Sequence, residues 1–180
     1  MKLNIPDADF FVFENFLERP TEALNWIASN EDWEQLYHNG YKAPRLNKGY
    51  GKGYTYSGHS IPDTAIRAHY QRLVDQLEKD WGIKSNQILL NYYRNGNDSI
   101  GLHSDDEKEL GYNPTVVSLS LGDSRIFELV NKKTGLVYPI ELGNNQLLVM
   151  GNMSQINYRH RIRKQAGKGR RISITFRQIK

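Results

Sequence analysis

Short apolar segments follow one another at close spacing through the second half of the chain. Their β-branched and aliphatic residues predict strands at 88–93, 116–121, 126–130, 137–142, 146–150 and 172–176. The turn residues Gly122-Asp123 and Gly143-Asn144-Asn145 predict hairpins between some of these strands. Many short strands separated by such turns are typical of a β-sandwich or jelly roll. The predicted fold class is therefore α+β, mainly β.

Helices are predicted only in the N-terminal half. A proline fits the first turn of a helix over 20–30, and an apolar stripe predicts a second helix over 66–81 that Asp63 caps. The aromatic run 10–13 predicts an initial strand that covers the core. Asn39-Gly40, with a tyrosine on either side, predicts a tight hairpin.

The composition fits one globular domain. The chain has 180 residues, of which 38% are hydrophobic, and no apolar run is long enough to cross a membrane. Its N-terminus lacks the apolar stretch of a signal peptide. We therefore expect a monomer in the cytoplasm, or in the nucleus of a eukaryote, with no membrane partner.

Any transition metal in this protein must be held by imidazole and carboxylate groups, because the chain has no cysteine. In an extended segment, His103 and Asp105 project to the same side and form half of a metal site. His160 follows the predicted strand 146–150, and a sheet running back beside the first would deliver it as the third ligand. Together they would form the two-histidine, one-carboxylate triad of non-haem Fe(II) oxygenases. The remaining histidines are interpreted as polar surface residues: His38, His59 and His69.

Two arginines occur in the last predicted strand. The alternation over 171–177 places its polar residues on one face: Arg171, Ser173, Thr175 and Arg177. Burying two arginines costs free energy unless they find a partner, and a small dicarboxylate such as 2-oxoglutarate provides one. The alternative is an edge strand on which both arginines are exposed.

Taken together, these motifs resemble the AlkB family of Fe(II)/2-oxoglutarate-dependent dealkylating dioxygenases. The resemblance runs from about Ala43 to the C-terminus and rests on residues that occur in a consistent order: Asn91, Tyr93, Gly96, His103, Asp105, Asp106, Glu107, His160, Arg171, Ser173, Thr175 and Arg177. It implies that the catalytic iron ligands are His103, Asp105 and His160. It implies contacts with 2-oxoglutarate from Asn91, Tyr93, Arg171, Ser173 and Arg177. The chain departs from the family at Ser173, where Asn is frequent near the cosubstrate, and at Tyr158, where Trp is frequent.

The same resemblance implies how the domain is organised. Residues 88–180 would form a double-stranded β-helix, which is a jelly roll whose open mouth collects ligands from non-adjacent strands. Residues 1–87 would supply the N-terminal helices and a nucleotide-recognition lid within one domain of residues 1–180. The predicted hairpin at Asn39-Gly40 belongs to this lid.

The stretch after Ala43 resembles the DNA-repair branch of the family and implies a substrate surface. Tyr54 and Tyr56 share one face of a strand and are predicted to hydrogen-bond to, and stack on, a flipped base, with Ser57 beside them. Packing against the core is the alternative for either tyrosine. Arg45 is predicted to meet a phosphate or a strand end.

Charged residues complete the predicted substrate surface. Glu107 is predicted to face the damaged base, where a carboxylate favours cationic lesions. Asp106, assigned to the same surface, is expected to pair with an arginine such as Arg171 or with the backbone. A basic cluster predicts a rim that contacts phosphates, and a solvated loop is the alternative. The cluster consists of Arg159, Arg161, Arg163, Lys164, Lys168, Arg170 and Arg171. A second basic stretch is interleaved with tyrosines: Lys42, Arg45, Lys48 and Lys52.

The predicted function is oxidative removal of N-alkyl groups from nucleobases such as N1-methyladenine and N3-methylcytosine. The expected cofactors are Fe(II), 2-oxoglutarate and O2, and the expected partner is alkylated DNA, with RNA left open. Single strands are expected to be preferred, because the hairpin tip carries no aliphatic wedge to fill a gap in a duplex. Two other functions stay open: a 2-oxoglutarate-dependent hydroxylase of a protein or small molecule, and a non-catalytic jelly roll that binds nucleic acid.

Overall fold

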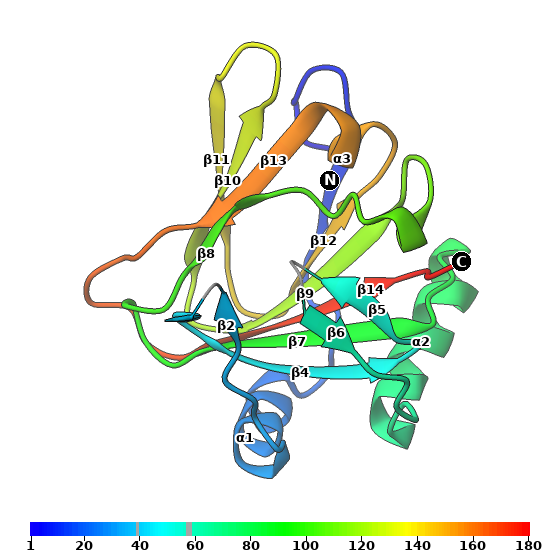
Figure 1. The fold of residues 1–180 in the computed structure, drawn as a ribbon, viewed down its shortest axis with the longest axis vertical. Helices are drawn as coiled ribbons and strands as arrows, with labels where there is room; N and C mark the ends of the chain where they lie inside the picture. The colour runs from blue at the N-terminus through cyan, green and yellow to red at the C-terminus, as the bar shows by residue number, and fades with distance from the viewer. Residues whose placement is uncertain (39, 57–58) are drawn as a thin grey trace.

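Two antiparallel sheets face each other in the computed structural model, which describes residues 1–38, 40–56 and 59–180 (Figure 1). Within these residues the larger sheet has six strands, in the spatial order β1 (Phe10–Phe13), β12 (Gln146–Met150), β9 (Val116–Gly122), β14 (Arg171–Arg177), β7 (Gln87–Tyr93) and β4 (Leu46–Gly51). The smaller sheet has four, in the order β11 (Val137–Leu142), β10 (Arg125–Asn131), β13 (Tyr158–Ile162) and β8 (Ile100–His103). Two hairpins stand apart from them, β2 (Tyr37–His38) with β3 (Tyr41–Lys42) and β5 (Tyr54–Tyr56) with β6 (His59–Ile61). This architecture confirms the predicted jelly roll.

The predicted strands are all present, and their bounds agree with the prediction to within one residue. Of the strands in the two sheets, the prediction omits β4, β8 and β13. β8 is short and contains Gly101, so it carries little strand signal. β13 alternates buried and more exposed residues, but two arginines occupy its outer positions and hide the apolar side.

The two predicted hairpin turns in the second half are wrong. β9 pairs with β12 and β14, whereas β10 pairs with β11 and β13, so Gly122-Asp123 carries the chain from one sheet to the other. The turn at 143–145 also joins strands of different sheets, β11 and β12. Gly122 and Asn145 have φ of 96° and 61°, which suits tight turns. Such residues show that the chain reverses, but not which strand it pairs with afterwards.

The longer helices pack on the outer face of the larger sheet (Figure 1). α1 (Pro20–Asn30) has the predicted bounds and buries Leu24 and Ile27. α2 (Ala68–Trp81) buries Val74 and Leu77 and ends at Gly82, which adopts the left-handed conformation of a helix cap. These residues and the apolar side chains of the sheet form one core.

Two predictions about helices need correction. Asp63 does not cap α2, because the helix begins at Ala68 and the Asp63 carboxylate accepts a 2.7 Å hydrogen bond from the Gly53 backbone N–H instead. Helices are not confined to the N-terminal half either. A short helix, α3 (Ser154–Asn157), and a 3₁₀ turn, η1 (Lys108–Leu110), lie further along the chain. No helix in the described ranges is both long and apolar enough to span a membrane.

The first 87 residues contribute two strands to the larger sheet. β1 pairs with β12, as its predicted role of covering the core requires, and β4 pairs with β7. The sheet therefore continues across the predicted division at residue 87. β2 and β3 pair in the predicted register of a hairpin, although Asn39 at its tip lies outside the described residues.

We expect Leu77→Ala to lower the free energy of unfolding by about 2–5 kcal/mol, because it leaves a cavity under the larger sheet. The Leu77 side chain is fully buried in the core that joins α2 to the sheet. Urea denaturation followed by circular dichroism measures the change. A loss below about 1 kcal/mol would show that α2 is not part of the cooperative core.

Candidate active site

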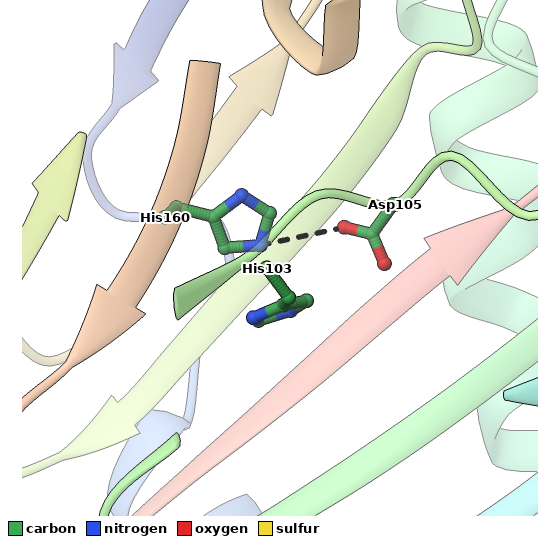
Figure 2. Close-up of side chains that lie close together, drawn as sticks. All are labelled: His103, Asp105 and His160. Atoms are coloured by element: carbon green, nitrogen blue, oxygen red, sulfur yellow. Dashed lines mark ion pairs between the residues drawn. The ribbon is translucent and has the colours of Figure 1, made fainter. Parts of the chain in front are cut away.

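Two histidines and an aspartate converge between the sheets (Figure 2). His160 on β13 lies directly opposite His103, the last residue of β8, and Asp105 follows two residues later. One ligand atom from each residue lies within 4.8 Å of the others. The Asp105 Oδ2 atom is 3.5 Å from His160 Nε2. The donor set and its spacing fit one transition-metal ion.

The pairing of β8 with β13 explains how these residues meet. Residues on β13 alternate between inside and outside, so Tyr158, His160 and Ile162 face the interior. The register shifts between His160 and Ile162, an irregularity of the kind that redirects side chains near active sites. The His160 ring also stacks on Phe127 of β10 at 5.1 Å, which fixes its plane.

The protonation states of the three groups suit metal binding. Burial, and then the neighbouring His103, lower the pKa of His160 to about 3, so its ring is neutral at pH 7. Burial also lowers the pKa of His103. The His103 Nδ1 atom lies 2.8 Å from the Gly101 carbonyl oxygen, so Nδ1 carries the proton and Nε2 the lone pair.

Arg177 keeps the Asp105 carboxylate ionised. Burial alone would raise the pKa of Asp105, but the positive charge of Arg177 lowers it to about 2. Arg177 donates from Nη2 and Nε to Asp105 Oδ1 at 2.6 and 3.0 Å. Because Oδ1 is engaged, Oδ2 is the oxygen turned toward His160.

Gln155 holds the backbone of the loop that carries Asp105, and the sequence does not predict this role. Its Oε1 atom accepts a 2.9 Å hydrogen bond from the Asp105 backbone N–H, and the side chain is 1% exposed. Lys132 donates to the Gln155 carbonyl oxygen at 2.7 Å. A lone glutamine near His160 carries no sequence signal, since its role depends on a loop about fifty residues away in the chain.

A pocket opens beside the triad on the inner faces of β7 and β14. The structure brings every predicted cosubstrate residue into its lining together with the triad: Asn91, Tyr93, Arg171, Ser173 and Arg177. Its apolar side is formed by Leu89, Ile100, Phe127 and Met150. β14 lies between β9 and β7 inside the sheet, so the alternative of an exposed edge strand is wrong.

Arg171 lacks partners for part of its guanidinium group. The side chain is 1% exposed and donates from Nη2 to Ser120 Oγ at 2.7 Å. In the described residues its Nε and Nη1 atoms have no hydrogen-bond partner. A buried cation with unpaired donors is costly, and a carboxylate of a bound molecule is the group that relieves this cost. The pocket therefore fits a ligand with a carboxylate at this end.

Asn91 is oriented by two donors. Arg45 Nε and Asn47 Nδ2 both donate to Asn91 Oδ1, at 2.8 and 2.7 Å. The Asn91 oxygen is therefore taken, and its amide NH2 group is the part left to serve the pocket. This contact also corrects the prediction for Arg45. Its side chain is 3% exposed and buried against Asn91, so it is not placed to meet a phosphate.

Comparison with known proteins identifies the family to which this chain belongs. The family model of the 2OG-Fe(II) oxygenase superfamily matches residues 9–177. The chain belongs to this superfamily. Its cofactors are thus Fe(II), 2-oxoglutarate and O2, as the sequence predicts, and the triad of His103, Asp105 and His160 is positioned for the iron.

Several relatives of this oxygenase carry AlkB names. It is 36% identical over 151 residues to alpha-ketoglutarate-dependent dioxygenase alkB homolog 3 of Bos taurus, covering 77% of this chain and 53% of the relative. It is 30% identical over 158 residues to DNA oxidative demethylase ALKBH2 of Mus musculus, covering 81% of this chain and 66% of the relative. The chain thus spans about half the length of the alkB homolog 3 relatives it matches. The solved structure of OsALKBH1 has a TM-score of 0.71 and 18% identity, covers 94% of this chain and 97% of its own, and supports the fold.

Glu107 lies close enough to Asp105 and Arg177 for their charges to act on it, and its environment is unusual. One carboxylate oxygen, Oε2, is buried without a hydrogen-bond partner in the described residues. Burial, and then the negative charge of Asp105, raise the pKa of Glu107 to about 7. Tyr54 is buried nearby, with the Arg177 guanidinium 5.9 Å from its ring. The side chain of Tyr56 and all of Ser57 lie outside the described part of the chain.

Asp106 does not pair with Arg171. It is exposed at the surface, where its Oδ2 atom lies 3.4 Å from Lys132 Nζ, whereas Arg171 is buried in the pocket. The two residues are held apart because the loop after β8 turns Asp105 inward and Asp106 outward.

The predicted basic rim is partly neutralised. Glu128 accepts hydrogen bonds from Arg161 at 2.6 Å and from Arg163 at 3.0 Å. Lys168 lies near Asp123, and Arg171 belongs to the pocket. Of the second basic stretch, Lys48 pairs with Glu34 at 2.8 Å. The net positive charge of both clusters is therefore smaller than the sequence indicates.

We expect His160→Ala and Asp105→Asn each to weaken metal binding by more than about 100-fold, because each variant removes one of three ligands. Anaerobic titration with Co(II), followed by its visible absorption, measures the affinity. Arg159→Gln, on the exposed side of β13, is the matched control and should bind Co(II) like the native protein. Unchanged affinity in His160→Ala would contradict the assigned triad.

Proposed function

We propose that this oxygenase removes N-alkyl groups from nucleobases of nucleic acid by oxidation, with single-stranded DNA as the preferred substrate. The observation that carries the proposal is the half-buried carboxylate of Glu107, which interacts electrostatically with Asp105 of the iron triad. One of its oxygens is buried without a hydrogen-bond partner among the described residues. The names of the relatives, among them a DNA oxidative demethylase, agree with it.

Different residues of the pocket would bind the iron and the cosubstrate. His103, Asp105 and His160 would hold Fe(II), and Arg171, with Asn91 and Tyr93 beside it, would hold a carboxylate of 2-oxoglutarate. With 2-oxoglutarate and O2, the bound iron supplies the oxidation that replaces a hydrogen of the N-methyl group with a hydroxyl group.

The protein itself positions the reactants and excludes water. Leu89, Phe127 and Met150 form an apolar wall around the triad, which limits access of solvent to the reacting carbon. The hydroxylated N-methyl group is a hemiaminal, and it releases formaldehyde without a hydrolytic residue. No side chain therefore needs to act as a general acid or base in the last step.

Glu107 is suited to recognise a positively charged base. A carboxyl group whose pKa is about 7 is only partly ionised in the protein alone. A cationic base such as N1-methyladenine or N3-methylcytosine beside it would favour the ionised form. The carboxylate would then accept a charge-assisted hydrogen bond from the base. A neutral base gains no such interaction, so the carboxylate selects for the alkylated cation.

The preference for single strands rests on the hairpin of β2 and β3. Each strand of this hairpin has two residues, and Tyr37 and Tyr41 are 52% and 81% exposed. Exposed aromatic rings can stack on unpaired bases. A hairpin this short offers little surface to hold a duplex open while a base is flipped out, and flipping costs a few kcal/mol in a duplex.

We expect Arg171→Gln to weaken 2-oxoglutarate binding by about 2–5 kcal/mol, because the buried carboxylate loses its charged partner. Its effect on the free energy of unfolding should be much smaller, since the Nε and Nη1 atoms of Arg171 have no hydrogen-bond partner among the described residues. Quenching of tryptophan fluorescence under anaerobic conditions measures the affinity. Unchanged affinity would remove Arg171 from the cosubstrate site, and Arg159→Gln again serves as the control.

We expect Glu107→Gln to slow demethylation of N1-methyladenine and N3-methylcytosine by about 1–3 kcal/mol of activation free energy, because the cationic base loses its carboxylate partner. Mass spectrometry of methylated single-stranded DNA, duplex DNA and RNA oligonucleotides measures the rates. Glu141→Gln, on β11, is the control.

The same assay tests the substrate. The native protein should act faster on single-stranded than on duplex DNA, and equal rates would contradict the strand preference. Turnover of 2-oxoglutarate without any demethylated base, in all three nucleic acids, would favour a protein or small-molecule substrate instead.

A further inference from the structure

A small apolar cluster, separate from the core beneath α1 and α2, includes residues near Glu107 and Tyr54 itself. It consists of Tyr54 on β5, Ile61 on β6, Leu110 in η1 and Ile179. Ile179 follows β14 by two residues and is 2% exposed, while Leu110 is 1% and Tyr54 is 5% exposed. The cluster therefore brings together three separate segments of the chain: the β5 and β6 hairpin, η1 and the residues after β14.

Asn86 fixes the backbone of Ile179. The Asn86 side chain donates from Nδ2 to the Ile179 carbonyl oxygen at 2.8 Å and accepts from the Ile179 N–H through Oδ1, also at 2.8 Å. Its own backbone is held by Arg177 and Lys52, through hydrogen bonds of 3.0 and 2.8 Å. The amide thus pairs with the peptide groups of Ile179 as a neighbouring strand would, and Ile179 cannot shift without breaking both bonds.

Ile179 belongs to one apolar cluster with both segments that are assigned to the base, the Glu107 loop and the Tyr54 strand, which are called the two walls below. On one side Leu110 follows Glu107, whose carbonyl oxygen accepts a 2.9 Å hydrogen bond from the Leu110 N–H. The Lys180 N–H also donates to the Glu109 carbonyl oxygen at 2.9 Å, which ties this loop to the segment after β14. On the other side lies Tyr54 of the β5 and β6 hairpin. The Ile179 side chain and the backbone beside it thus connect the Glu107 loop with the Tyr54 strand.

We propose that Ile179, clamped by Asn86, is a positioning residue for base recognition: it sets the spacing between the Glu107 loop and the Tyr54 strand. This inference rests on the proposed function, because it assigns those two walls to the base. Neither Ile179 nor Asn86 is among the described residues that line the pocket of the triad and Arg171. Changes at these positions therefore act on the nucleic-acid substrate and not on the metal or the cosubstrate.

Steady-state kinetics with a methylated single-stranded oligonucleotide tests the proposal. Ile179→Ala and Asn86→Ala should lower kcat/KM for the oligonucleotide by about 10- to 100-fold, because the two walls lose their common support. Their affinities for Co(II) and 2-oxoglutarate should equal those of the native protein. Ile179→Val, which keeps most of the buried volume, should restore kcat/KM to within about 3-fold.

Leu77→Ala is the matched control, because it removes a buried apolar side chain of similar size from the main core. All rates are measured well below the unfolding temperature of the least stable variant. If Leu77→Ala lowers kcat/KM as much as Ile179→Ala does, the effect is general destabilisation and the proposal is wrong. It is equally wrong if Ile179→Ala keeps native kcat/KM, or if its 2-oxoglutarate affinity falls in parallel.

Hydrogen exchange of the backbone amides separates this inference from the proposed function. In Ile179→Ala, exchange should become faster in both 52–56 and 106–111, whereas in Leu77→Ala these two segments should keep native rates. Faster exchange in only one segment would overturn the idea of a common support. If the native protein demethylates none of the oligonucleotides, the proposed function fails, while the exchange data still decide whether Ile179 links the two walls.

Discussion

The ion pair between Arg177 and Asp105 connects the larger sheet to the loop that follows β8 of the smaller sheet. Arg177 belongs to β14 of the larger sheet, and Asp105 follows β8 of the smaller one. Both side chains are almost fully buried, at 3% and 1% exposure, so neither charge is tolerable without the other. The pair also leaves Asp105 with one oxygen turned toward His160. The same ion pair therefore connects the two sheets and orients a metal ligand.

The sequence predicts this site well where the chemistry of a residue limits its use. Without cysteine, a metal ion has to be held by histidine and carboxylate, and the spacing of His103 and Asp105 leaves few choices for a third ligand. The alternation through β14 correctly places two arginines on one face, and both prove to be buried in the pocket. Periodicity likewise predicts most strands, since it reports which side of a strand is buried.

Prediction fails where a residue's role depends on a distant partner. Arg45 carries the same charge whether it meets a phosphate or Asn91, and only the pairing of β4 with β7 places it against Asn91. Asp63 offers a good helix cap, yet its carboxylate is taken by Gly53 across a loop. Gln155 and Asn86 support other residues through their amide groups, which have no characteristic spacing in sequence.

The position of β14 has a consequence for how the chain folds. It lies between β9 and β7, where Ser173 pairs with Ser120 on one side and Asn91 on the other. The larger sheet therefore has a gap until a late part of the chain arrives, and contacts this far apart in sequence form slowly. Until then β9 and β7 each have an unpaired edge, and such edges promote aggregation. The strand that carries both pocket arginines is thus also the one that makes the sheet continuous, so solubility during synthesis and assembly of the active site depend on the same seven residues.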